Sequence, residues 1–593
     1  MFPHFKVTKI VCLAILVFNS STFFAQSTTS KKELKKSKPL EKAPSDATDL
    51  APDRKNYKIN LKTVHQPSHD FVNEQEVHYE LNRKNISLQT GYDFIFDPFS
   101  PEGYLKRDRP NQDIGEWDLN KRTIYRNHRA LLDMEIRLNG QNKLLLHQQF
   151  NYTHTDKKDH TLGREIKKNM QRNHLVKSYH FSQVWQHLLS KATTIEVGGM
   201  ENFVSMKNPG QSITATQIQS QQLKTKTTAM GGFASLQHQH TGGTTKATFE
   251  YQGLSLEENG QQGMEKSAFF PAFQYRENLF SFRLAHRAAL SQRSALDFEL
   301  GIENPHLRKN ATHVKEEKLV SHQKEKHLDV TYQLSYSSTP TKNQSYTLSI
   351  EKRLIRPTYD QLNPITTLYY DLIYTSGTLN LHPTKEYTLS LETTQKQWTL
   401  QLYAGYAKDL IVRYYTLEDQ RLLLTNANFN TPFLAGLNTR YTRDFFSGFW
   451  SSHTHGQLVY RRIEAEKALR NTPRLKVYSA HTFHLGHSWK TGLNFTYASN
   501  YKDPFTKHFH YTQLDVFIEK KIGKNLKISI FGEDIFKANR KWEQFRVEDA
   551  LFSRNINLDH NTYGIALQYR IKGKEFQHRH IAKPKDPLLQ RIP

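Results

Sequence analysis

Residues 563–571 read Tyr-Gly-Ile-Ala-Leu-Gln-Tyr-Arg-Ile, and every odd position of this stretch carries an apolar or aromatic side chain. Gly, Ala, Gln and Arg hold the even positions. Because successive side chains of a β-strand point to opposite faces, this alternation predicts a strand with one apolar and one polar face. We expect lipid to contact Tyr563, Ile565, Leu567 and Tyr569, and the lumen to contain Gly564, Ala566, Gln568 and Arg570.

The same period of two recurs along most of the chain, most clearly in residues 86–96, 296–302, 328–336 and 398–406. About 22 to 24 such segments can be counted, many of roughly ten residues or more, as tilted membrane-spanning strands require. A soluble β-sandwich also shows this alternation, but its strands are usually nearer five or six residues. The pattern predicts an all-β fold, a large transmembrane antiparallel β-barrel of about 22 strands.

The composition agrees with a barrel. Of the 593 residues, 37% are hydrophobic, which is low for one large soluble core, and 12% are aromatic, which is high. In a membrane barrel the strands face lipid on one side and water on the other, and aromatic girdles mark both membrane interfaces.

Residues 1–25 have the layout of a secretory signal peptide. Lys6 and Lys9 precede an apolar run at residues 10–18 that is too short to span a membrane comfortably. Cys12 lies in this run and is the sole cysteine, so we expect a mature chain without disulfides or thiol chemistry. An exported chain of alternating strands without a long apolar helix is expected in the cell outer membrane.

Three further segments follow the signal peptide. Residues 26–56 are rich in Lys, Ser and Pro, have no aromatic residue, and are expected to form a disordered basic linker. Residues 57–571 contain the alternating segments of the barrel. Residues 572–593 form a basic, Pro-containing tail.

The connections between segments alternate in length near the C-terminus, as in outer-membrane barrels with short periplasmic turns and long extracellular loops. The segments 275–281 and 289–294 are both short, so the alternation is not fixed further upstream. The short connections lie at 339–341, 486–488 and 520–524, and the long ones at 356–384, 464–474 and 537–561.

Residues 354–364, Leu-Ile-Arg-Pro-Thr-Tyr-Asp-Gln-Leu-Asn-Pro, resemble a signature of the outer-membrane β-barrel family common in Bacteroidetes, a family related to TonB-dependent receptors. The family motif usually continues as Gly-Asn-Pro-x-Leu-x-Pro-Glu. Gly377, Leu381 and Pro383 match this continuation, whereas Thr378, Leu379 and Thr384 depart from it. The physical reading of 354–364 is structural, because Pro ends strand pairing and Asn-Pro starts a turn.

Supporting similarity covers roughly residues 57–571. The next hairpin resembles the family at 408–411 and at the Asn-rich residues 425–430. The end of the chain does so at 531–536, which lead through a long loop to the last strand.

The resemblance implies solute transport or binding at the cell surface. A non-transporting scaffold or assembly barrel that binds surface polymers or a partner protein is the alternative. Relatives carry a plug domain before the barrel, and residues 26–56 are too few to form one. We therefore expect a plugless relative, a lumen filled by loops or the linker, or a barrel that works with a second chain, and no energised uptake by this chain alone.

The chain is strongly basic, with 82 Lys and Arg against 57 Asp and Glu, a net charge of +25. Export removes it from cytoplasmic nucleic acid, so no nucleic-acid partner is expected. The charge favours contact with anionic lipopolysaccharide or an anionic solute, and a basic surface without a specific ligand is the alternative. Other expected partners are outer-membrane lipid, the barrel-insertion machinery, and a plug-bearing or surface lipoprotein.

Histidine spacing raises the question of a metal site, because residues i and i+2 of a strand share a face. No cysteine lies near these histidines and no third ligand recurs, so we predict no metal site and no cofactor. The chain has no G-x-S-x-G, P-loop or H-E-x-x-H motif, so we expect no enzyme and no catalytic residues. Substrate-binding residues are not identified. The histidines concerned are the pairs His238/His240, His453/His455 and His508/His510, and the group His481, His484 and His487.

Overall fold

The computed structural model describes most of the chain between residues 54 and 572. The expected signal peptide, residues 26–53 of the expected linker and residues 573–593 lie outside the described residues. In the described part, no helix has the length and apolar character needed to cross a bilayer. The described residues are 54–65, 72–83, 85–99, 102–109, 112–163, 167–214, 218–264, 267–269, 271–312, 321–370, 373–418, 421–465, 471–536, 538, 540–557 and 562–572.

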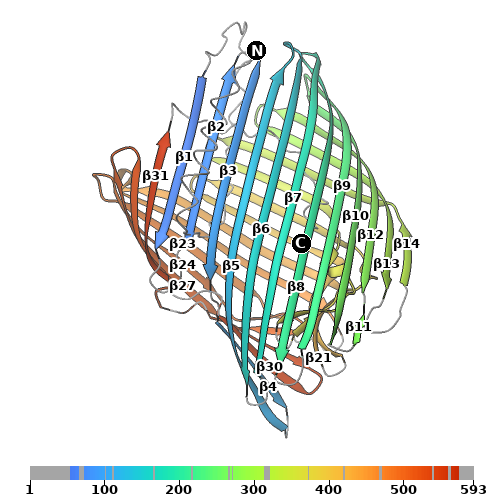
Figure 1. Cartoon of the computed structure of the whole chain (residues 1–593). Helices are drawn as coiled ribbons and strands as arrows, with labels where there is room; N and C mark the ends of the chain where they lie inside the picture. The colour runs from blue at the N-terminus through green and yellow to red at the C-terminus, as the bar shows by residue number, and fades with distance from the viewer. Residues whose placement is uncertain are drawn as a thin grey trace, which may run out of the picture.

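A closed ring of antiparallel strands forms the molecule. The last strand pairs with the first, so the ring has no free edge (Figure 1). Within the described residues the ring has 22 strands, which confirms the predicted barrel. They are β1 (Arg54–His65), β2 (Val72–Arg83), β3 (Ile86–Phe99), β5 (Gln112–Arg137), β6 (Asn142–Gly163), β7 (Lys167–Ser190), β8 (Thr193–Thr214), β9 (Ile218–His240), β10 (Gly243–Met264), β12 (Ala272–Ser291), β13 (Ser294–Thr312), β15 (Asp329–Thr341), β16 (Gln344–Ile355), β19 (Thr384–Gln395), β20 (Trp398–Glu418), β21 (Arg421–Phe445), β22 (Trp450–Glu464), β23 (Arg474–His484), β24 (Trp489–Ala498), β27 (Tyr511–Ile522), β28 (Leu526–Glu533) and β31 (Thr562–Lys572).

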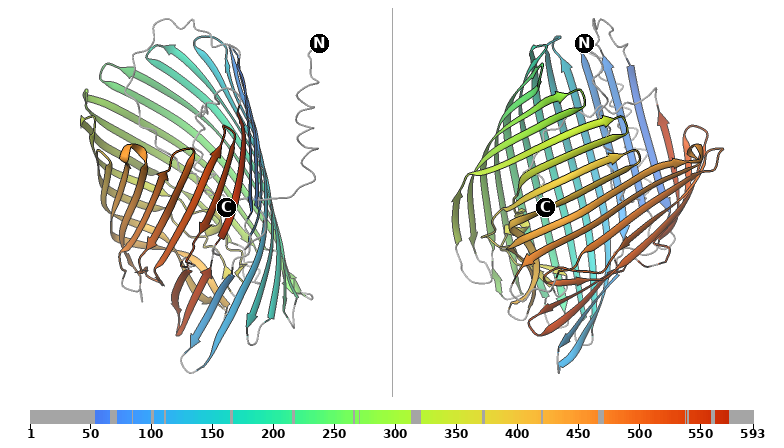
Figure 2. Two further views of the ribbon diagram at one scale, coloured as in Figure 1. Left: turned by 90° about the vertical axis from the view of Figure 1, so that its left-hand side faces the viewer. Right: turned by 180° about the vertical axis from the view of Figure 1, so that it is seen from behind.

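Short elements occupy the connections between these strands. The hairpin of β29 and β30 lies between β28 and β31, and it extends the sheet by pairing with β26 and β4 (Figure 2). The short elements are β4 (Glu102–Arg109), β11 (Ser267–Phe269), β14 (Ser321–Lys326), α2 (Tyr359–Leu362), β17 (Thr367–Tyr370), β18 (Ile373–Thr375), η2 (Phe446–Gly448), β25 (Tyr501–Lys502), β26 (Thr506–His508), β29 (Arg540–Val547) and β30 (Ala550–Asn557).

The two ends of the barrel differ. All the connections at one end, here called the turn rim, are tight turns between strands, and this end lies at the top of Figure 1. The opposite end, the loop rim, contains the longer connections and all the short β-elements just named. The described residues of the turn rim are 85, 138–141, 191–192, 241–242, 292–293, 342–343, 396–397, 446–449, 485–488 and 523–525.

This arrangement settles the alternation that the sequence left open upstream. The segment 289–294 contains a turn of the turn rim at residues 292–293. The expected connection at residues 275–281 is wrong, because these residues lie inside β12 and pair with both β10 and β13. They were mistaken for a turn because polar residues such as Arg276 and Glu277 occupy both faces of the strand at this point.

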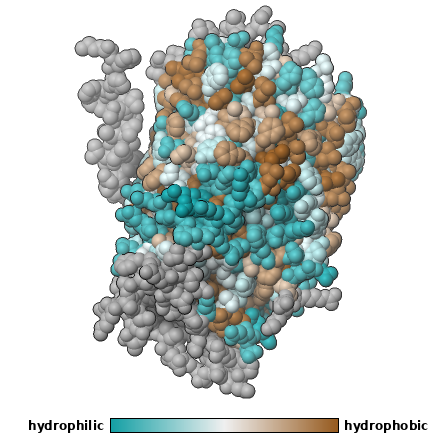
Figure 3. Space-filling view, turned by 90° about the vertical axis from the view of Figure 1, so that its right-hand side faces the viewer, coloured by the Kyte–Doolittle hydropathy of each residue, from teal (hydrophilic) through white to brown (hydrophobic). Residues whose placement is uncertain are grey.

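Several strands are longer than a bilayer requires. β5 has 26 residues and β7 has 24, whereas a tilted membrane strand needs roughly 9–11. The large apolar side chains exposed on β9 are Met230 and Leu236, and both lie in the half of the strand next to the turn rim. Figure 3 shows the same distribution on one side of the barrel, with apolar residues gathered towards the turn rim and a hydrophilic belt below them.

The last strand faces as its sequence predicts. Tyr563, Ile565, Leu567 and Tyr569 are 44–49% exposed on the outer surface of the ring. The even positions point to the lumen, where Gly564 is buried and Ala566 and Gln568 are half-buried. The side chain of Arg570 lies outside the described residues.

A pair of substitutions in β31 tests this facing. We expect Leu567→Arg, at the middle of the strand, to lower the free energy of unfolding by about 2–4 kcal/mol, because it places a charge against lipid. The neighbouring Gln568→Arg points into the lumen and should change stability only mildly. The measurement is urea unfolding of each variant in lipid vesicles, and equal losses at the two positions would contradict the assignment.

Candidate functional site in the lumen near the loop rim

The connection between β16 and β19, residues 356–383, folds into the barrel and is called here the inner loop. It packs on side chains that point to the lumen. On β12, for example, Phe273 and Tyr275 are buried against the loop while Arg276 on the opposite face is exposed. The contact forms an apolar cluster of Leu223, Ala229, Leu254, Leu256, Phe273, Tyr275 and Ala311 from the wall with Tyr359, Leu362, Ile365 and Leu381 from the loop.

Arg356, the first residue of the inner loop, ties the loop to two wall strands. Its Nη2 donates to Glu303 Oε2 of β13 at 2.8 Å and to Asp329 Oδ2 of β15 at 3.4 Å. Arg283 and His327 lie beside the same two carboxylates, at 3.9 and 3.1 Å. Because Arg356 and Asp329 are only 9% and 6% exposed, neither charge can be solvated if the other is removed.

Two further polar contacts hold the rest of the loop against the wall. Asn363 Nδ2 donates to Glu258 Oε1 of β10 at 2.7 Å, and Thr225 donates to the other oxygen of the same carboxylate at 2.8 Å. The buried ammonium of Lys309 donates to Glu325 Oε1 at 2.7 Å and to the carbonyl oxygen of Leu379 at 2.8 Å. The loop is therefore attached to the wall along most of its length.

The two halves of the family signature lie against each other inside the loop. Gly377 N donates to the carbonyl oxygen of Asn363 at 2.7 Å, and Thr378 N donates to that of Gln361 at 2.6 Å. A Cβ atom at Gly377 would lie 2.5 Å from the Gln361 oxygen, so only glycine fits there. The expected structural role of residues 354–364 agrees with these contacts, although the sequence did not indicate the wall contacts of Arg356.

A second apolar cluster joins the inner loop to the β29–β30 hairpin. Its members come from β18, from the loop-rim end of β21 and from the hairpin. Tyr415 of β20 stacks on Phe545 of the hairpin, with ring centroids 3.8 Å apart and planes 11° apart. The cluster consists of Ile373, Leu422, Leu424, Phe545, Val547, Ala550 and Phe552.

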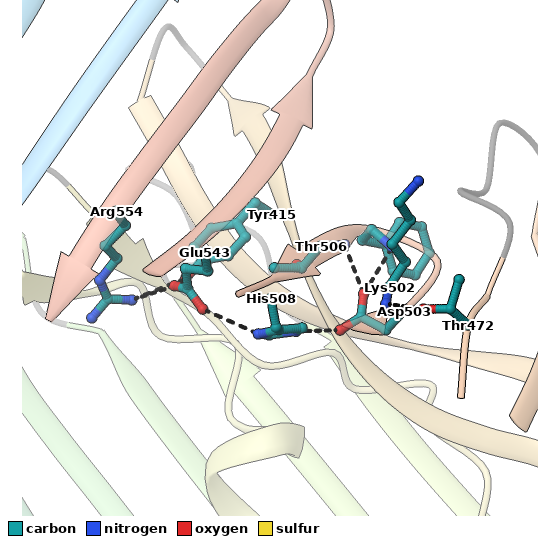
Figure 4. A network of polar contacts seen from close by, with 9 residues as sticks. Tyr415, Thr472, Lys502, Asp503, Thr506, His508, Glu543 and Arg554 are labelled. Atoms are coloured by element: carbon teal, nitrogen blue, oxygen red, sulfur yellow. Dashed lines mark hydrogen bonds and ion pairs between the residues drawn. The ribbon is translucent and has the colours of Figure 1, made fainter. Parts of the chain in front are cut away.

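Next to this cluster lies a chain of ionisable side chains, called here the vestibule network (Figure 4). Arg554 Nη1 donates to Glu543 Oε1 at 3.2 Å and to the Tyr415 hydroxyl at 3.1 Å. His508 stands between two carboxylates, with its Nε2 2.8 Å from Asp503 Oδ2 and its Nδ1 4.0 Å from Glu543 Oε2. Acidic and basic groups therefore alternate along the network.

The exposed end of the network is fixed by backbone contacts. Asp503 Oδ1 accepts hydrogen bonds from the backbone N–H groups of Phe505 at 3.0 Å and Thr506 at 2.7 Å. The ring of Tyr501 stacks on His508 at 4.3 Å. Burial raises the pKa of the Tyr501 phenol above 10.0, although Arg474 nearby opposes this, so the ring is a neutral stacking partner at physiological pH.

This arrangement offers hydrogen-bond donors and acceptors beside aromatic rings, which suits the binding of a polar solute. Among the described residues, no group of three or more His, Cys, Asp or Glu side chains is placed to hold a metal ion. His508 was noted in the sequence for its spacing from His510. Its partners are Asp503, five residues away in the β25–β26 hairpin, and Glu543 of β29, and the spacing of residues in the sequence indicates neither contact.

The other histidines that the sequence pattern singled out lie at separate places in the barrel. His238 and His240 stack on each other beside the turn at 241–242, with ring centroids 6.3 Å apart. His481 and His484 are three residues apart on β23 and so lie on opposite faces. His453 accepts or donates a hydrogen bond with Thr442 at 2.8 Å, and His455 follows on the same strand. His487 lies in the turn after β23, and His510 contacts Asn500 at 3.3 Å.

Comparison with known proteins places this site in context. A family model described as "Outer membrane protein beta-barrel family" matches residues 241–569. No curated protein sequence matches the chain. Among solved structures, the copper transporter OprC aligns with a TM-score of 0.59 at 9% identity over 88% of this chain and 81% of its own.

Two other solved structures resemble the chain to a similar extent. The ferric yersiniabactin uptake receptor FyuA from Yersinia pestis has a TM-score of 0.61 at 10% identity, covering 87% of this chain and 80% of its own. The unliganded ferric citrate transporter FecA has a TM-score of 0.58 at 9% identity, covering 88% and 79%. At such low identity the likeness concerns the fold alone.

The attachment of the inner loop can be tested through Arg356. We expect Arg356→Ala to lower the free energy of unfolding by about 3–5 kcal/mol, because it leaves Glu303 and Asp329 buried without their main cation. The matched control is Arg287→Ala, which removes an ion pair with Asp297 in which the two side chains are 62% and 38% exposed. The control should cost less than about 1 kcal/mol in the same urea titration. Similar losses for the two variants would contradict the anchoring role of Arg356.

Proposed function

Because the chain belongs to the outer membrane protein beta-barrel family, we propose that it binds or passes a solute at the cell surface, through the lumen beside the inner loop. The barrel is located in the outer membrane. The observation that carries the proposal is the vestibule network, which places alternating acidic and basic groups and aromatic rings beside the inner loop. Such a surface can recognise a polar solute that enters from the loop rim.

The comparisons support this class of function without naming a solute. OprC is called a copper transporter, FyuA a ferric yersiniabactin uptake receptor and FecA a ferric citrate transporter. All are transporters or receptors, and we propose a non-enzymatic role for this chain as well. What these proteins carry is not assigned to this chain, because at 9–10% identity the likeness concerns the fold alone.

The proposal includes an orientation and a set of partners. We assign the loop rim to the cell exterior and the turn rim to the periplasm, as short turns and long loops are arranged in bacterial barrels. The signal peptide, linker and tail expected from the sequence are part of the proposal. So are the barrel-insertion machinery and a plug-bearing or surface lipoprotein, because uptake driven by a periplasmic motor would need such a partner.

The scaffold alternative also has an observation in its favour. The inner loop is held by an apolar cluster and by buried ion pairs, so it occupies its part of the lumen in a fixed conformation. A loop that never moves would obstruct passage, and the barrel would then serve only to present its loops to a surface polymer or a partner protein.

Conductance in planar bilayers distinguishes the two functions. We expect the mature protein to conduct weakly and a variant with residues 357–383 replaced by a short Gly-Ser linker to conduct strongly and steadily, because the inner loop fills part of the lumen. Deletion of residues 26–53 is the matched control and should leave the conductance of the mature protein unchanged.

Other results have definite meanings. A mature protein that is completely silent and conducts only after the inner loop is replaced would favour the scaffold function, because the fixed loop would then block passage. Opening on deletion of residues 26–53 alone would contradict the role given to the inner loop, since the linker would then act as the plug. Uptake driven by proton-motive force in cells lacking any plug-bearing partner would contradict the proposed need for one.

A further inference from the structure

A group of basic side chains lies on the outside of the barrel, facing away from the lumen. All six members are exposed. They come from β7, β8, β9, β12 and β13, which form six consecutive strands of the ring together with β10 between β9 and β12. We call this group the outer basic patch. It consists of Lys177, Lys207, Lys224, Lys226, Arg276 and Arg308.

The alternation of burial fixes the direction of these side chains. On β9, Lys224 and Lys226 are exposed, whereas the intervening Thr225 points to the lumen and is 5% exposed. The exposed Met230 lies on the same face. It belongs to the group of exposed apolar side chains in the half of the barrel next to the turn rim, called here the apolar band. The patch therefore lies on the outer face of the wall. Closer to the turn rim, this same face contacts the membrane.

The position along the strands places the patch at the edge of the apolar band. Lys226 lies four residues from the exposed Met230, in the direction of the loop rim, and Arg276 lies four residues from the exposed Phe280. At the rise of a β-strand this is about 13 Å. Lys177 lies nearer to an aromatic side chain, because its ammonium is 5.8 Å from the ring of Tyr152. This is the depth at which lipid headgroups meet a membrane barrel.

Two pairs of like charges in the patch face each other across neighbouring strands. Lys207 of β8 is the direct cross-strand partner of Lys224 of β9, and Arg276 of β12 is the direct partner of Arg308 of β13. Like charges directly opposite in a sheet destabilise it. In the described part of the chain one ion pair reaches the patch, between Arg276 and Glu257 at 4.0 Å, and both side chains are more than 40% exposed. Glu257 is also the direct cross-strand partner of Lys226, so this one carboxylate lies beside two of the six cations. Among the described residues no ion pair reaches Lys207, Lys224 or Arg308, so the repulsion within the two like-charged pairs is only partly offset.

We propose that the outer basic patch binds phosphate groups carried on lipid headgroups, with a phosphorylated glycolipid of the outer leaflet as its occupant. Several phosphates at fixed spacing on one headgroup can bridge the two like-charged pairs, with charge-assisted hydrogen bonds from Lys and Arg. A soluble anion destined for the lumen has no reason to bind on the outside of the wall. The assignment of the lipid to the outer leaflet rests on the orientation proposed above. The binding of phosphate groups by the patch does not depend on whether a solute passes through the lumen.

The test uses the full mature protein in detergent and a fluorescent diphosphorylated lipid A as the probe. The patch variant combines Lys207→Gln, Lys224→Gln, Arg276→Gln and Arg308→Gln. The control variant combines Lys191→Gln, Lys342→Gln, Lys521→Gln and Lys524→Gln, which removes the same charge from exposed residues at the turn rim. Boiling-sensitive migration on gels shows whether each variant has kept its closed barrel.

We expect the patch variant to bind the lipid at least tenfold more weakly than the wild-type protein, and the control variant to bind as the wild type does. Without the lipid, the patch variant should be no less stable than the wild type, because its like-charge repulsion has been removed. The binding of the wild type should weaken as salt is raised.

Three outcomes would overturn the proposal. They are equal binding by the patch variant and the wild type, equal weakening of the patch and control variants, and competition by inorganic phosphate at concentrations comparable to those of the lipid. If the patch variant does not fold, the two double variants Lys207→Gln/Lys224→Gln and Arg276→Gln/Arg308→Gln are measured separately. Each must then weaken binding for the proposal to stand.

Discussion

The pairing of β1 with β31 is the contact on which the rest of this structure depends. Inside a bilayer no water is available for unpaired backbone N–H and C=O groups, so a sheet can cross it only when its first and last strands meet. Here Ile59 lies opposite Ile571 and Leu61 opposite Tyr569, and the ring closes without an edge. Once the ring is closed, alternate side chains must face either the surroundings or the lumen, and the two faces take on separate tasks.

The lumen face serves to hold the inner loop. Near the loop rim the inward side chains of β10 and β12 include the apolar Leu254, Leu256 and Tyr275, and the loop covers these three. Buried carboxylates on the wall receive the polar groups of the loop, as Glu303 and Asp329 receive Arg356. The same loop contacts the β29–β30 hairpin, which carries part of the vestibule network. A change in the position of the loop would therefore move Glu543 relative to His508. The outer face has a different task and divides into an apolar band and the basic patch.

Features that depend on local alternation could be predicted from the sequence, whereas features that depend on distant partners could not. The facing of Leu567 follows from its immediate neighbours, and the turn at 486–488 was found from its composition. The error at residues 275–281 arose because β12 continues beyond the apolar band, where alternation of apolar and polar residues ceases. Arg356 was read as part of a turn signature, since its partners Asp329 and Glu303 are 27 and 53 residues away in the chain. His508 was paired with His510 by spacing, but its carboxylates come from Asp503 and from the distant β29.

The central claim is that the inner loop lies inside a closed barrel, against the lumen face of β10. Cross-linking tests it most directly, because Cys12 is the single cysteine of the chain and precedes the expected mature protein. Asn363 and Glu258 are joined by a side-chain hydrogen bond of 2.7 Å, so cysteines introduced as Asn363→Cys and Glu258→Cys should be joined by a short bismaleimide cross-linker in the membrane-inserted protein. The control combines Asn363→Cys with Ser255→Cys, whose side chain lies on the opposite face of the same strand and should not cross-link. A cross-link between positions 363 and 258 without one between 363 and 255 is the predicted result. Failure to cross-link at 363 and 258, in a protein that still migrates as a closed barrel, would contradict the account.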